Sequence, residues 1–282
     1  MKLLRYGPKG QERPGLLDDA GQVRDLSAHV SDLAGDGVSL TALDAIRSID
    51  VASLPVVTDP GRIGSPLAWV PNFLCIGLNY ALHAAESGMD APQEPIVFSK
   101  ATSALSGPDD DIILPRTAEK GDWEVELGVV IGKTALYVSE ADALDHVAGY
   151  CTINDVSERS FQIERGGQWI KGKSAPTFGP VGPWLVTADE VQDPQALRVS
   201  LTLNGDTVQD SNTSDMIFSV RQIISHLSQF MELRPGDVIA TGTPSGVGMG
   251  MKPQRFLRPG DLMTVEVAGL GKQTQTVVAA KA

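Results

Sequence analysis

The sequence predicts an α+β protein in which strands outnumber helices, and three observations support this fold class. The chain has 282 residues, of which 42% are hydrophobic, so it can bury one large core and a small additional domain. Most apolar runs are short and are bounded by Gly, Pro or Asp, as strands that end in turns are. Helical periodicity is confined to a few segments.

The first 65 residues are predicted to form a small N-terminal α/β domain, and residues 66–282 are predicted to form the catalytic domain. Strands are expected at 1–6, 13–17 and 23–26, and a helix is expected at 39–49. The sequence Thr58-Asp59-Pro60-Gly61 marks the exit from this unit, because Pro and Gly favour turns.

In the larger domain, the apolar run 73–76 opens a region of short strands. Helices are expected at 80–87 and 218–230; the apolar face of the second consists of Val220, Ile223, Ile224, Leu227 and Met231. Leu-Arg-Pro-Gly-Asp occurs at 233–237 and again at 257–261, each time before an alternating or apolar strand. Pro followed by Gly suits a type II turn, so we interpret the two copies as similar turns rather than as an internal repeat.

The charge of the chain argues against nucleic acid and anionic membranes as partners. The formal net charge is -12 and the pI is near 4.7, whereas both partners require a basic surface. We find no signal peptide and no apolar stretch of membrane-spanning length, so a cytoplasmic location is expected. Cys75 and Cys151 lie in apolar runs and are interpreted as buried thiols, which disfavours a disulfide framework or a cysteine zinc site.

Two acids interrupt the segment 123–132, which otherwise has the pattern of a buried strand. Residues two apart in a strand point to the same face, so the carboxylates of Glu124 and Glu126 should converge on one spot. Burying them requires covering cations or a wet cleft at the strand end. Asp155 lies near the end of a second apolar run, 149–156, and could share one divalent cation with both. Oxygen ligands favour Mg²⁺ or Mn²⁺, with Ca²⁺ as an alternative, over zinc.

Lys171 and Lys173 follow Trp169 in a turn of small residues. A lysine beside a metal-carboxylate site neutralises excess negative charge and stabilises a developing enolate or oxyanion. The alternative interpretation is a pair of ordinary surface lysines.

His83 and Glu86 are three residues apart, which places them on one face if 80–87 is helical. A carboxylate orients an imidazole and raises its basicity, so the pair could act as a general base toward water. A surface contact is the alternative. Gly88 and the polar stretch up to Glu94 would allow this segment to move as a lid.

The segment 239–248 ends a strand in a Gly-rich loop with three hydroxyl groups. Such a loop can offer backbone N–H groups and hydroxyls to an anionic substrate, although it lacks the lysine and the spacing of a P-loop.

Six motifs together resemble the fumarylacetoacetate hydrolase family, in content and in order along the chain. They are Ile76-Gly77-Leu78-Asn79-Tyr80, Glu124-Val125-Glu126-Leu127, Asn154-Asp155, Gly172-Lys173-Ser174, Ser214-Asp215-Met216-Ile217-Phe218 and Thr241-Gly242-Thr243-Pro244. The resemblance covers about residues 70–280, and residues 1–65 look like the variable N-terminal domain of the family. It implies a mixed β-sandwich roll, assembled as a homodimer, with a small-molecule 2-oxo acid as substrate.

The resemblance also implies roles for individual residues. A divalent cation, Mg²⁺ first and Mn²⁺ or Ca²⁺ as alternatives, would be held by the acids Glu124, Glu126 and Asp155. Lys173 would lie in the active site, and His83 with Glu86 would activate water on a lid. The positions that contact the substrate or its carboxylate in relatives are matched by Arg159, Gln162 and Thr243.

Two residues depart from the pattern of the family. Leu82 stands where relatives commonly have Asp before the lid histidine, which removes a polar contact beside His83. Pro176 stands where relatives commonly have Asp, which stiffens the loop after Lys173 and removes a charge.

These features lead to the hypothesis of a metal-dependent hydrolase that cleaves a carbon–carbon bond in a 2,4-dioxo acid and releases pyruvate. The segment from Glu158 through Gly182 looks closest to bacterial 2,4-diketo-3-deoxy-L-fuconate hydrolases or ureidoglycolate lyases. Substrates would be acylpyruvates or 2,4-diketo-3-deoxy sugar acids. The alternatives are oxaloacetate decarboxylase, 2-hydroxyhepta-2,4-diene-1,7-dioate isomerase or ureidoglycolate lyase activity at the same site, and a non-catalytic metal-binding scaffold.

Overall fold

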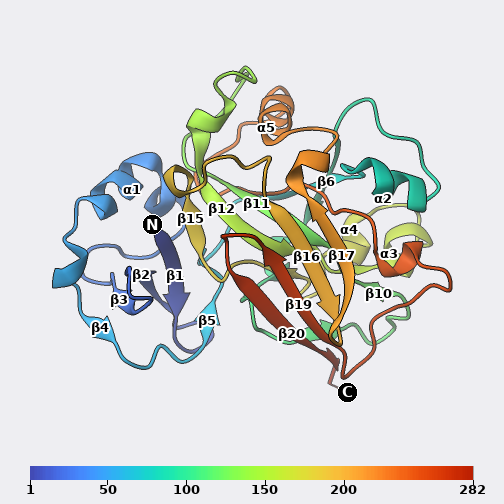
Figure 1. Ribbon diagram of the computed structural model, residues 1–282, viewed down its shortest axis with the longest axis horizontal. Helices are drawn as coiled ribbons and strands as arrows, with labels where there is room; N and C mark the ends of the chain where they lie inside the picture. Colours follow the sequence, from blue (N-terminus) through green and yellow to red (C-terminus); the bar gives the residue numbers. More distant parts are fainter. Residues whose placement is uncertain (282) are drawn as a thin grey trace.

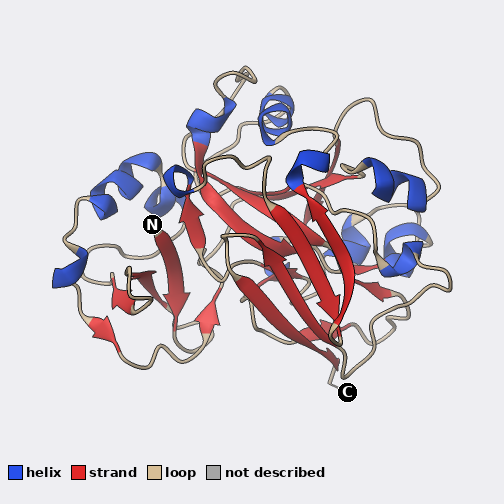
Figure 2. Cartoon of the chain, in the orientation of Figure 1, coloured by secondary structure: helices blue, strands red, loops and turns tan. Residues whose placement is uncertain are grey.

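The computed structural model describes residues 1–281, which fold around β-sheets with helices at their margins (Figure 1). The described chain contains twenty strands and five α-helices, and the strands fill the centre of the molecule (Figure 2). The predicted α+β class, predominantly β, is confirmed.

The elements have the following bounds. The strands are β1 (Lys2–Tyr6), β2 (Arg13–Leu17), β3 (Val23–Asp25), β4 (Val56–Val57), β5 (Ile63–Gly64), β6 (Phe73–Gly77), β7 (Ile96–Lys100), β8 (Leu105–Ser106), β9 (Ile112–Leu114), β10 (Gly121–Asp122), β11 (Val125–Ile131), β12 (Val147–Asn154), β13 (Ser157–Glu158), β14 (Gly179–Pro180), β15 (Leu185–Thr187), β16 (Arg198–Leu203), β17 (Asp206–Asn212), β18 (Val238–Ala240), β19 (Leu262–Val267) and β20 (Lys272–Ala279). The α-helices are α1 (Leu40–Arg47), α2 (Ala81–Glu86), α3 (Arg159–Ile163), α4 (Ile170–Lys173) and α5 (Val220–Ser228).

The larger sheet contains eleven strands. Ten of them follow the order β4-β3-β2-β1-β15-β12-β11-β18-β6-β7, and β5 pairs with β1 beside this path. The N-terminal strands enter the sheet through β1, in which Leu3 is the cross-strand partner of Leu185 in β15. The first 65 residues therefore share a sheet with the rest of the chain, while the predicted domain division at residues 65 and 66 stays a prediction.

A second sheet of five strands, β17-β16-β19-β20-β9, packs against one face of the larger sheet. Apolar side chains from β11, β16, β19 and α5 form one buried cluster between them, including Leu127, Leu201, Val265, Ile223 and Leu227. A second cluster lies on the other face of the larger sheet and joins it to the N-terminal residues. The two sheets are thus layers of a sandwich.

Strand β11 lies in the middle of the larger sheet and presents different side chains on its two faces. Its odd-numbered residues from Val125 to Ile131 are apolar and pack between the sheets. On the opposite face, Glu126 and Gly128 precede Val130, which packs into the second cluster. The alternation predicted for this strand is confirmed, and it directs the acids away from the core between the sheets.

The predicted helices and turns are confirmed with small changes at their ends. Helix α1 begins after Ser39, whose side chain accepts a hydrogen bond from Ala42 N–H, and α5 begins with a capping box formed by Ser219 and Gln222. In the two Leu-Arg-Pro-Gly-Asp segments, Gly236 has φ 87° and Gly260 has φ 96°, as a type II turn requires.

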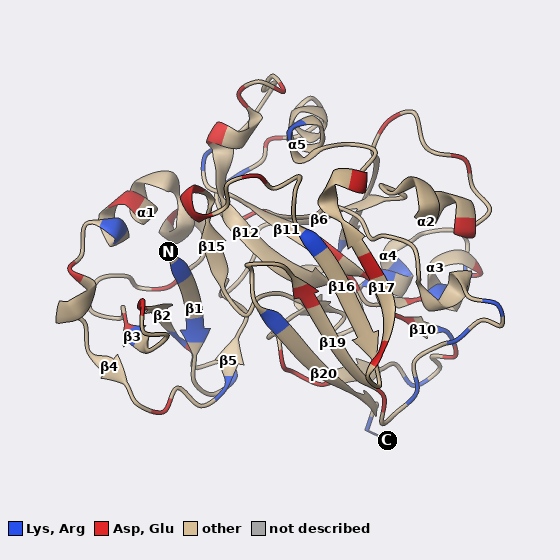
Figure 3. Ribbon diagram, in the orientation of Figure 1, with Lys and Arg blue, Asp and Glu red and all other residues tan. Residues whose placement is uncertain are grey.

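The charged residues are distributed over the whole ribbon. Lys and Arg are interspersed with Asp and Glu in Figure 3. No helix within residues 1–281 combines the length and the apolar composition that crossing a membrane requires. Cys75 and Cys151 are buried free thiols, as predicted.

We expect Gly128→Ala to lower the free energy of unfolding by about 1–3 kcal/mol, the usual cost of overpacking a dense core. A Cβ at this position would lie 2.6 Å from both Cys151 Sγ and Ile153 Cδ1. Urea unfolding followed by circular dichroism measures the change. The double variant Gly128→Ala/Cys151→Ala should lose less than the sum of the two single variants, because the sulfur is then absent. Full additivity would contradict this packing.

Candidate functional site

Glu124, Glu126 and Asp155 meet at one end of the larger sheet. Strand β11 begins at Val125 where the antiparallel strand β12 ends at Asn154, and these two residues are cross-strand partners. The Asp155 N–H donates to the Glu124 carbonyl oxygen at 2.9 Å, which extends the pairing by one residue. Carboxylate oxygens of the three acids lie within 4.8 Å of one another. The structure thus brings the three predicted side chains together, while metal binding itself stays a prediction.

Buried cations compensate two of these acids. Lys173 Nζ donates to Glu124 Oε2 at 2.6 Å and to Asp155 Oδ2 at 2.8 Å. Arg159 Nη2 donates to Glu124 Oε1 at 2.7 Å. Lys100, whose side chain is fully buried, pairs with the other oxygen of Asp155. Glu124 and Asp155 therefore each have two cationic partners.

Glu126 has no such partner within residues 1–281. Its carboxylate is 2% exposed and accepts one hydrogen bond, from Gly242 N–H at 2.8 Å. Burial raises the pKa of Glu126 well above its ordinary value, and Asp155 and Glu124 raise it further. Burial also opposes ionisation of Glu124, but Lys173 and Arg159 outweigh it and hold the pKa of Glu124 below its usual range. Neighbouring acids with opposed pKa shifts are typical of functional sites.

This arrangement fits a divalent cation. Four buried acids and three buried cations leave one negative charge uncompensated: Asp122, Glu124, Glu126 and Asp155 against Lys100, Arg159 and Lys173. The donor set is entirely oxygen, which suits Mg²⁺, Mn²⁺ or Ca²⁺. We therefore take Glu124, Glu126 and Asp155 as the candidate metal ligands.

Lys173 reaches the acids because α4 packs tightly against α3. A Cβ on Gly172 would lie 2.5 Å from the Glu158 carbonyl oxygen, so only glycine allows this approach. Burial lowers the pKa of Lys173, but Asp155 and Glu124 outweigh it, and the ammonium group stays charged. The neighbouring Lys171 is exposed and donates to a backbone carbonyl. The structure thus places Lys173, and not Lys171, beside the acids.

Arg159 and Gln162 lie on α3 and line the same cavity as the acids. Arg159 Nε donates to Asp122 Oδ2 at 2.8 Å, and Nη1 donates to Gln162 Oε1 at 3.0 Å. A guanidinium group only donates, so the oxygen of Gln162 faces Arg159 and its NH₂ group is directed elsewhere. Arg159 therefore holds Glu124 and Gln162 in place, and the predicted contacts of both residues with substrate stay predictions.

His83 and Glu86 form a hydrogen-bonded pair on α2. His83 Nδ1 lies 2.8 Å from Glu86 Oε1. An ionised carboxylate only accepts, so Nδ1 carries the proton and Nε2 of the neutral ring remains an acceptor. Glu86 Oε2 also accepts from Gly246 N–H at 2.9 Å, which fastens α2 to the Gly-rich loop. This is the geometry of an oriented base, and its action on water stays a prediction.

The Gly-rich loop directs its N–H groups to the protein's own carboxylates. Gly242, Gly246 and Gly248 donate to Glu126, Glu86 and Asp122, respectively. These three N–H groups are therefore already bound within the protein, and the predicted role of the loop toward an anionic substrate stays a prediction for its other donors.

Thr243 lies in the same loop and lines the cavity. Its hydroxyl donates to the Val125 carbonyl oxygen at 3.0 Å and accepts from Gln209 Nε2 at 2.8 Å. The hydroxyl proton is thus used within the protein, and the predicted substrate contact of Thr243 stays a prediction.

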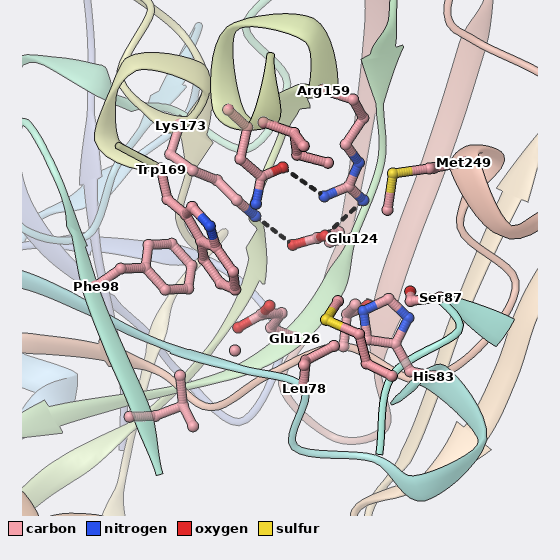
Figure 4. Close-up of a pocket in the computed structure, with 16 residues that line it drawn as sticks. Leu78, His83, Ser87, Phe98, Glu124, Glu126, Arg159, Trp169, Lys173 and Met249 are labelled. Atoms are coloured by element: carbon pink, nitrogen blue, oxygen red, sulfur yellow. Dashed lines mark hydrogen bonds and ion pairs between the residues drawn. The ribbon is translucent and has the colours of Figure 1, made fainter. Parts of the chain in front are cut away.

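Glu124, Glu126, Lys173 and His83 open into one cavity of about 200 Å³. In Figure 4, Glu126 lies between Phe98 and Trp169 on one side and Leu78 and His83 on the other. The cavity is lined by Ile76, Gly77, Leu78, His83, Ser87, Met89, Phe98, Glu124, Glu126, Arg159, Gln162, Ile163, Trp169, Lys173, Thr243 and Met249. The two departures from the family pattern, Leu82 and Pro176, are exposed and are not among the residues of this lining.

Sequence reasoning missed Lys100 and Asp122. Lys100 ends the apolar strand β7, and Asp122 comes directly before the buried Trp123. A charge at the end of an apolar strand was the signal that identified Glu124, and the same signal was available for both residues. Asp122 accepts hydrogen bonds from Arg159 and from Gly248 N–H, so it connects Arg159 to the Gly-rich loop.

Comparison with known proteins gives consistent matches over the chain. The model of the fumarylacetoacetate (FAA) hydrolase C-terminal domain matches residues 72–278. A Burkholderia lata protein, whose name gives hydrolase and no substrate, is 59% identical over 276 residues, covering 98% of each chain.

Solved structures of the same type align over nearly the whole chain. Fumarylacetoacetate hydrolase from Exiguobacterium antarcticum has a TM-score of 0.88 and 36% identity, with 99% of this chain and 100% of that chain covered. Maleylpyruvate hydrolase from Sphingobium sp. SYK-6, in complex with manganese(II) and pyruvate, has a TM-score of 0.81 and 29% identity, with both chains fully covered. A 2-hydroxyhepta-2,4-diene-1,7-dioate isomerase from Mycobacterium marinum has a TM-score of 0.77 and 30% identity, also with full coverage of both.

We expect Lys100→Met to lower the free energy of unfolding by about 3 kcal/mol, because it leaves part of the Asp155 charge buried and uncompensated. Guanidinium unfolding in the presence of EDTA measures the change. The control Lys171→Met removes an exposed lysine and should stay within about 0.5 kcal/mol of the parent. Equal losses in the two variants would contradict the buried pairing of Lys100.

We expect Glu126→Gln to separate fold stability from metal binding. At pH 7 in EDTA the variant should be at least as stable as the parent, because the amide removes repulsion from Glu124 and Asp155 and still accepts from Gly242 N–H. The stability difference should decrease as the pH falls and vanish near and below the ordinary carboxyl pKa of 4.5, where Glu126 is protonated in the unfolded chain as well as in the folded one.

Metal addition supplies the second half of this test. Mn²⁺ at about 100 times its Kd should stabilise the parent by about 2.7 kcal/mol, read as a rise in Tm, and should leave Glu126→Gln unchanged. Glu164→Gln, at an exposed acid that pairs with Lys120, should keep the full rise. A Mn²⁺ response in Glu126→Gln equal to that of the parent would exclude Glu126 as a ligand.

Proposed function

The chain belongs to the fumarylacetoacetate hydrolase family, and from this premise we propose that it is a hydrolase of 2,4-dioxo acids that uses a divalent cation, Mg²⁺ or Mn²⁺. It cleaves the bond between C3 and C4 and releases pyruvate. The Sphingobium relative that was solved with manganese(II) and pyruvate supports both the metal and the product.

The observation that carries this proposal is the position of His83. Its Nδ1 is held by Glu86, its Nε2 is left as an acceptor, and its ring lines the same cavity as Glu124 and Glu126. Hydrolysis requires an activated water, whereas decarboxylation of oxaloacetate requires only that an enolate be stabilised. An oriented base beside the acids therefore favours hydrolysis over decarboxylation. Isomerisation of a dienol also transfers a proton, so the substrate panel below, and not the base alone, separates it from hydrolysis.

In the proposed reaction, the 2-oxo acid end of the substrate binds between Gln162 and Lys173. A divalent cation held by Glu124, Glu126 and Asp155 would polarise the 2-oxo group and offset the charge that develops on it. The NH₂ group of Gln162 is free to donate to the substrate carboxylate. Lys173 uses two N–H groups on Glu124 and Asp155, which leaves a third for the substrate.

The chemical steps follow from the lid pair. Nε2 of His83 takes a proton from water while the water oxygen bonds to C4, and Glu86 stabilises the imidazolium that forms. The C3–C4 bond then breaks and its electron pair remains on C3 as pyruvate enolate, whose charge Lys173 stabilises. Return of the proton to C3 gives pyruvate, and C4 leaves as a carboxylic acid that contains the water oxygen.

We expect the purified protein with Mg²⁺ or Mn²⁺ to release pyruvate from acylpyruvates, measured by a coupled lactate dehydrogenase assay. The panel should include a 2,4-diketo-3-deoxy sugar acid, oxaloacetate and 2-hydroxyhepta-2,4-diene-1,7-dioate, the last followed by its absorbance. A faster reaction with oxaloacetate than with acylpyruvates would indicate a decarboxylase. A faster reaction with 2-hydroxyhepta-2,4-diene-1,7-dioate would indicate an isomerase. If the protein binds Mn²⁺ but transforms none of them, the non-catalytic scaffold is supported instead.

We expect His83→Ala to lower kcat for acylpyruvate hydrolysis by about 10²–10⁴-fold, the usual contribution of a general base. Decarboxylation of oxaloacetate, if it occurs as a side reaction, should fall much less, because it needs no activated water. The Mn²⁺-induced rise in Tm should persist, since His83 is not a ligand. His29→Ala, at an exposed histidine of the N-terminal region, serves as the control. Unchanged hydrolysis in His83→Ala would exclude this residue as the base.

A further inference from the structure

The cavity has polar side chains on one part of its wall and apolar side chains over much of the rest. Glu124, Glu126, Gln162 and Lys173 belong to the polar part. The lining also contains six apolar side chains that we call the apolar wall: Leu78, Met89, Phe98, Ile163, Trp169 and Met249. In Figure 4, Phe98, Trp169 and Leu78 lie around Glu126, and Met249 lies beside Arg159. Whatever extends from C4 of a substrate therefore meets thioether, aliphatic and aromatic surface.

The cationic side chains in the lining are already bound to acids of the protein. The described lining residues include two cationic side chains, those of Arg159 and Lys173, and one imidazole, that of His83. Arg159 binds Asp122 and Glu124, and Lys173 binds Glu124 and Asp155. A second carboxylate at the distal end of a substrate would lose its hydration without finding an uncommitted cation.

The lining also offers few hydroxyl partners for a polyhydroxy chain. Thr243 uses its hydroxyl on Val125 and Gln209. Ser87 Oγ is buried without a partner in the described chain, so it offers one hydroxyl to a bound ligand. A sugar-like arm would bury several hydroxyls against the apolar wall with too few partners.

The aromatic part of the wall is held rigidly. Phe98 and Trp169 pack edge to face with ring centroids 5.2 Å apart. Trp169 lies against the backbone of β6, because a Cβ on Gly77 would be 2.7 Å from its Cζ3 atom. A fixed aromatic surface favours ligands that supply apolar area without reorganising the site.

We propose that the group attached to C4 of the substrate is an apolar alkyl or aryl arm, and not a carboxylate-bearing or polyhydroxy arm. This inference rests on the proposed function for the position of C4, but it concerns the chemistry of the cavity wall. It separates this chain from the dioate isomerase relative, whose name specifies a second carboxylate. It also excludes 2,4-diketo-3-deoxy sugar acids as preferred substrates.

Binding of unreactive 2-oxo acids tests the proposal without turnover. 2-Oxohexanoate and 2-oxoadipate have the same chain length and differ in a terminal methyl against a terminal carboxylate. In calorimetric titrations of the Mn²⁺-loaded protein, 2-oxohexanoate should bind at least about tenfold more tightly, because the distal carboxylate has no free cation. Equal affinities, tighter binding of 2-oxoadipate, or binding of neither acid would overturn the proposal.

A charge introduced into the wall should reverse this preference. Ile163 lies at the end of α3 with 51% of its surface exposed, so Ile163→Arg is compatible with folding. It should shift the affinity ratio toward 2-oxoadipate by about fivefold or more, whereas the neutral variant Ile163→Gln should not. Ile113→Arg adds the same charge on β9, outside the cavity, and should leave the ratio unchanged. An equal shift with Ile113→Arg would mean that net charge, and not the wall, sets the preference.

Turnover distinguishes this proposal from the proposed function. Pyruvate release from 2,4-dioxooctanoate is expected to exceed release from 2,4-dioxooctanedioate, its counterpart with a distal carboxylate. Faster release from the dioate would overturn the apolar arm and leave hydrolysis standing. Release from neither compound, with 2-oxohexanoate still preferred in binding, would contradict hydrolysis and support the apolar wall.

Discussion

Glu126 is buried and has no cationic partner among residues 1–281, and the rest of the site depends on this constraint. Its neighbours Glu124 and Asp155 each have two cations, and the Gly242 N–H is the one donor that Glu126 receives. A buried carboxylate that faces two others is costly, and the cost appears as a raised pKa. A divalent cation removes this imbalance and leaves the site slightly positive, which suits an anionic 2-oxo acid.

The backbone supplies the positions that this charge arrangement needs. The antiparallel pairing of β11 with β12 places Glu124, Glu126 and Asp155 at one end of the sheet. The close approach of α4 to α3 places Lys173 beside them. Glu86 connects α2 to the Gly-rich loop and also binds Nδ1 of His83, so one carboxylate fixes both the helix and the orientation of the imidazole. Gly242, Gly246 and Gly248 of the loop donate to acids of the protein. The proposed substrate contacts accordingly involve Gln162, Lys173 and the apolar wall.

The sequence predicted what depends on local geometry. Alternation along a strand identified Glu124 and Glu126, spacing along a helix identified His83 and Glu86, and Pro-Gly pairs identified the two turns. It did not predict the order of strands, because pairings such as Leu3 with Leu185 join distant residues. Lys100 and Asp122 were missed for a related reason. Each adjoins an apolar run, which indicates a buried charge, but their partners Asp155 and Arg159 lie far along the chain, so the local sequence does not show with which residue that charge is paired. Family motifs, rather than periodicity, supplied Arg159, Gln162 and Thr243.

Binding of a metal ion among Glu124, Glu126 and Asp155 is the central prediction for this protein. Anomalous diffraction from a crystal of the protein with Mn²⁺, collected at the manganese absorption edge, measures this directly. We expect a single strong peak in contact with carboxylate oxygens of all three acids, at about 2.0–2.2 Å as small divalent cations prefer. Absence of an anomalous peak at these acids in a crystal at saturating Mn²⁺ would contradict metal binding. It would mean that Lys173 and Lys100 alone compensate the acids.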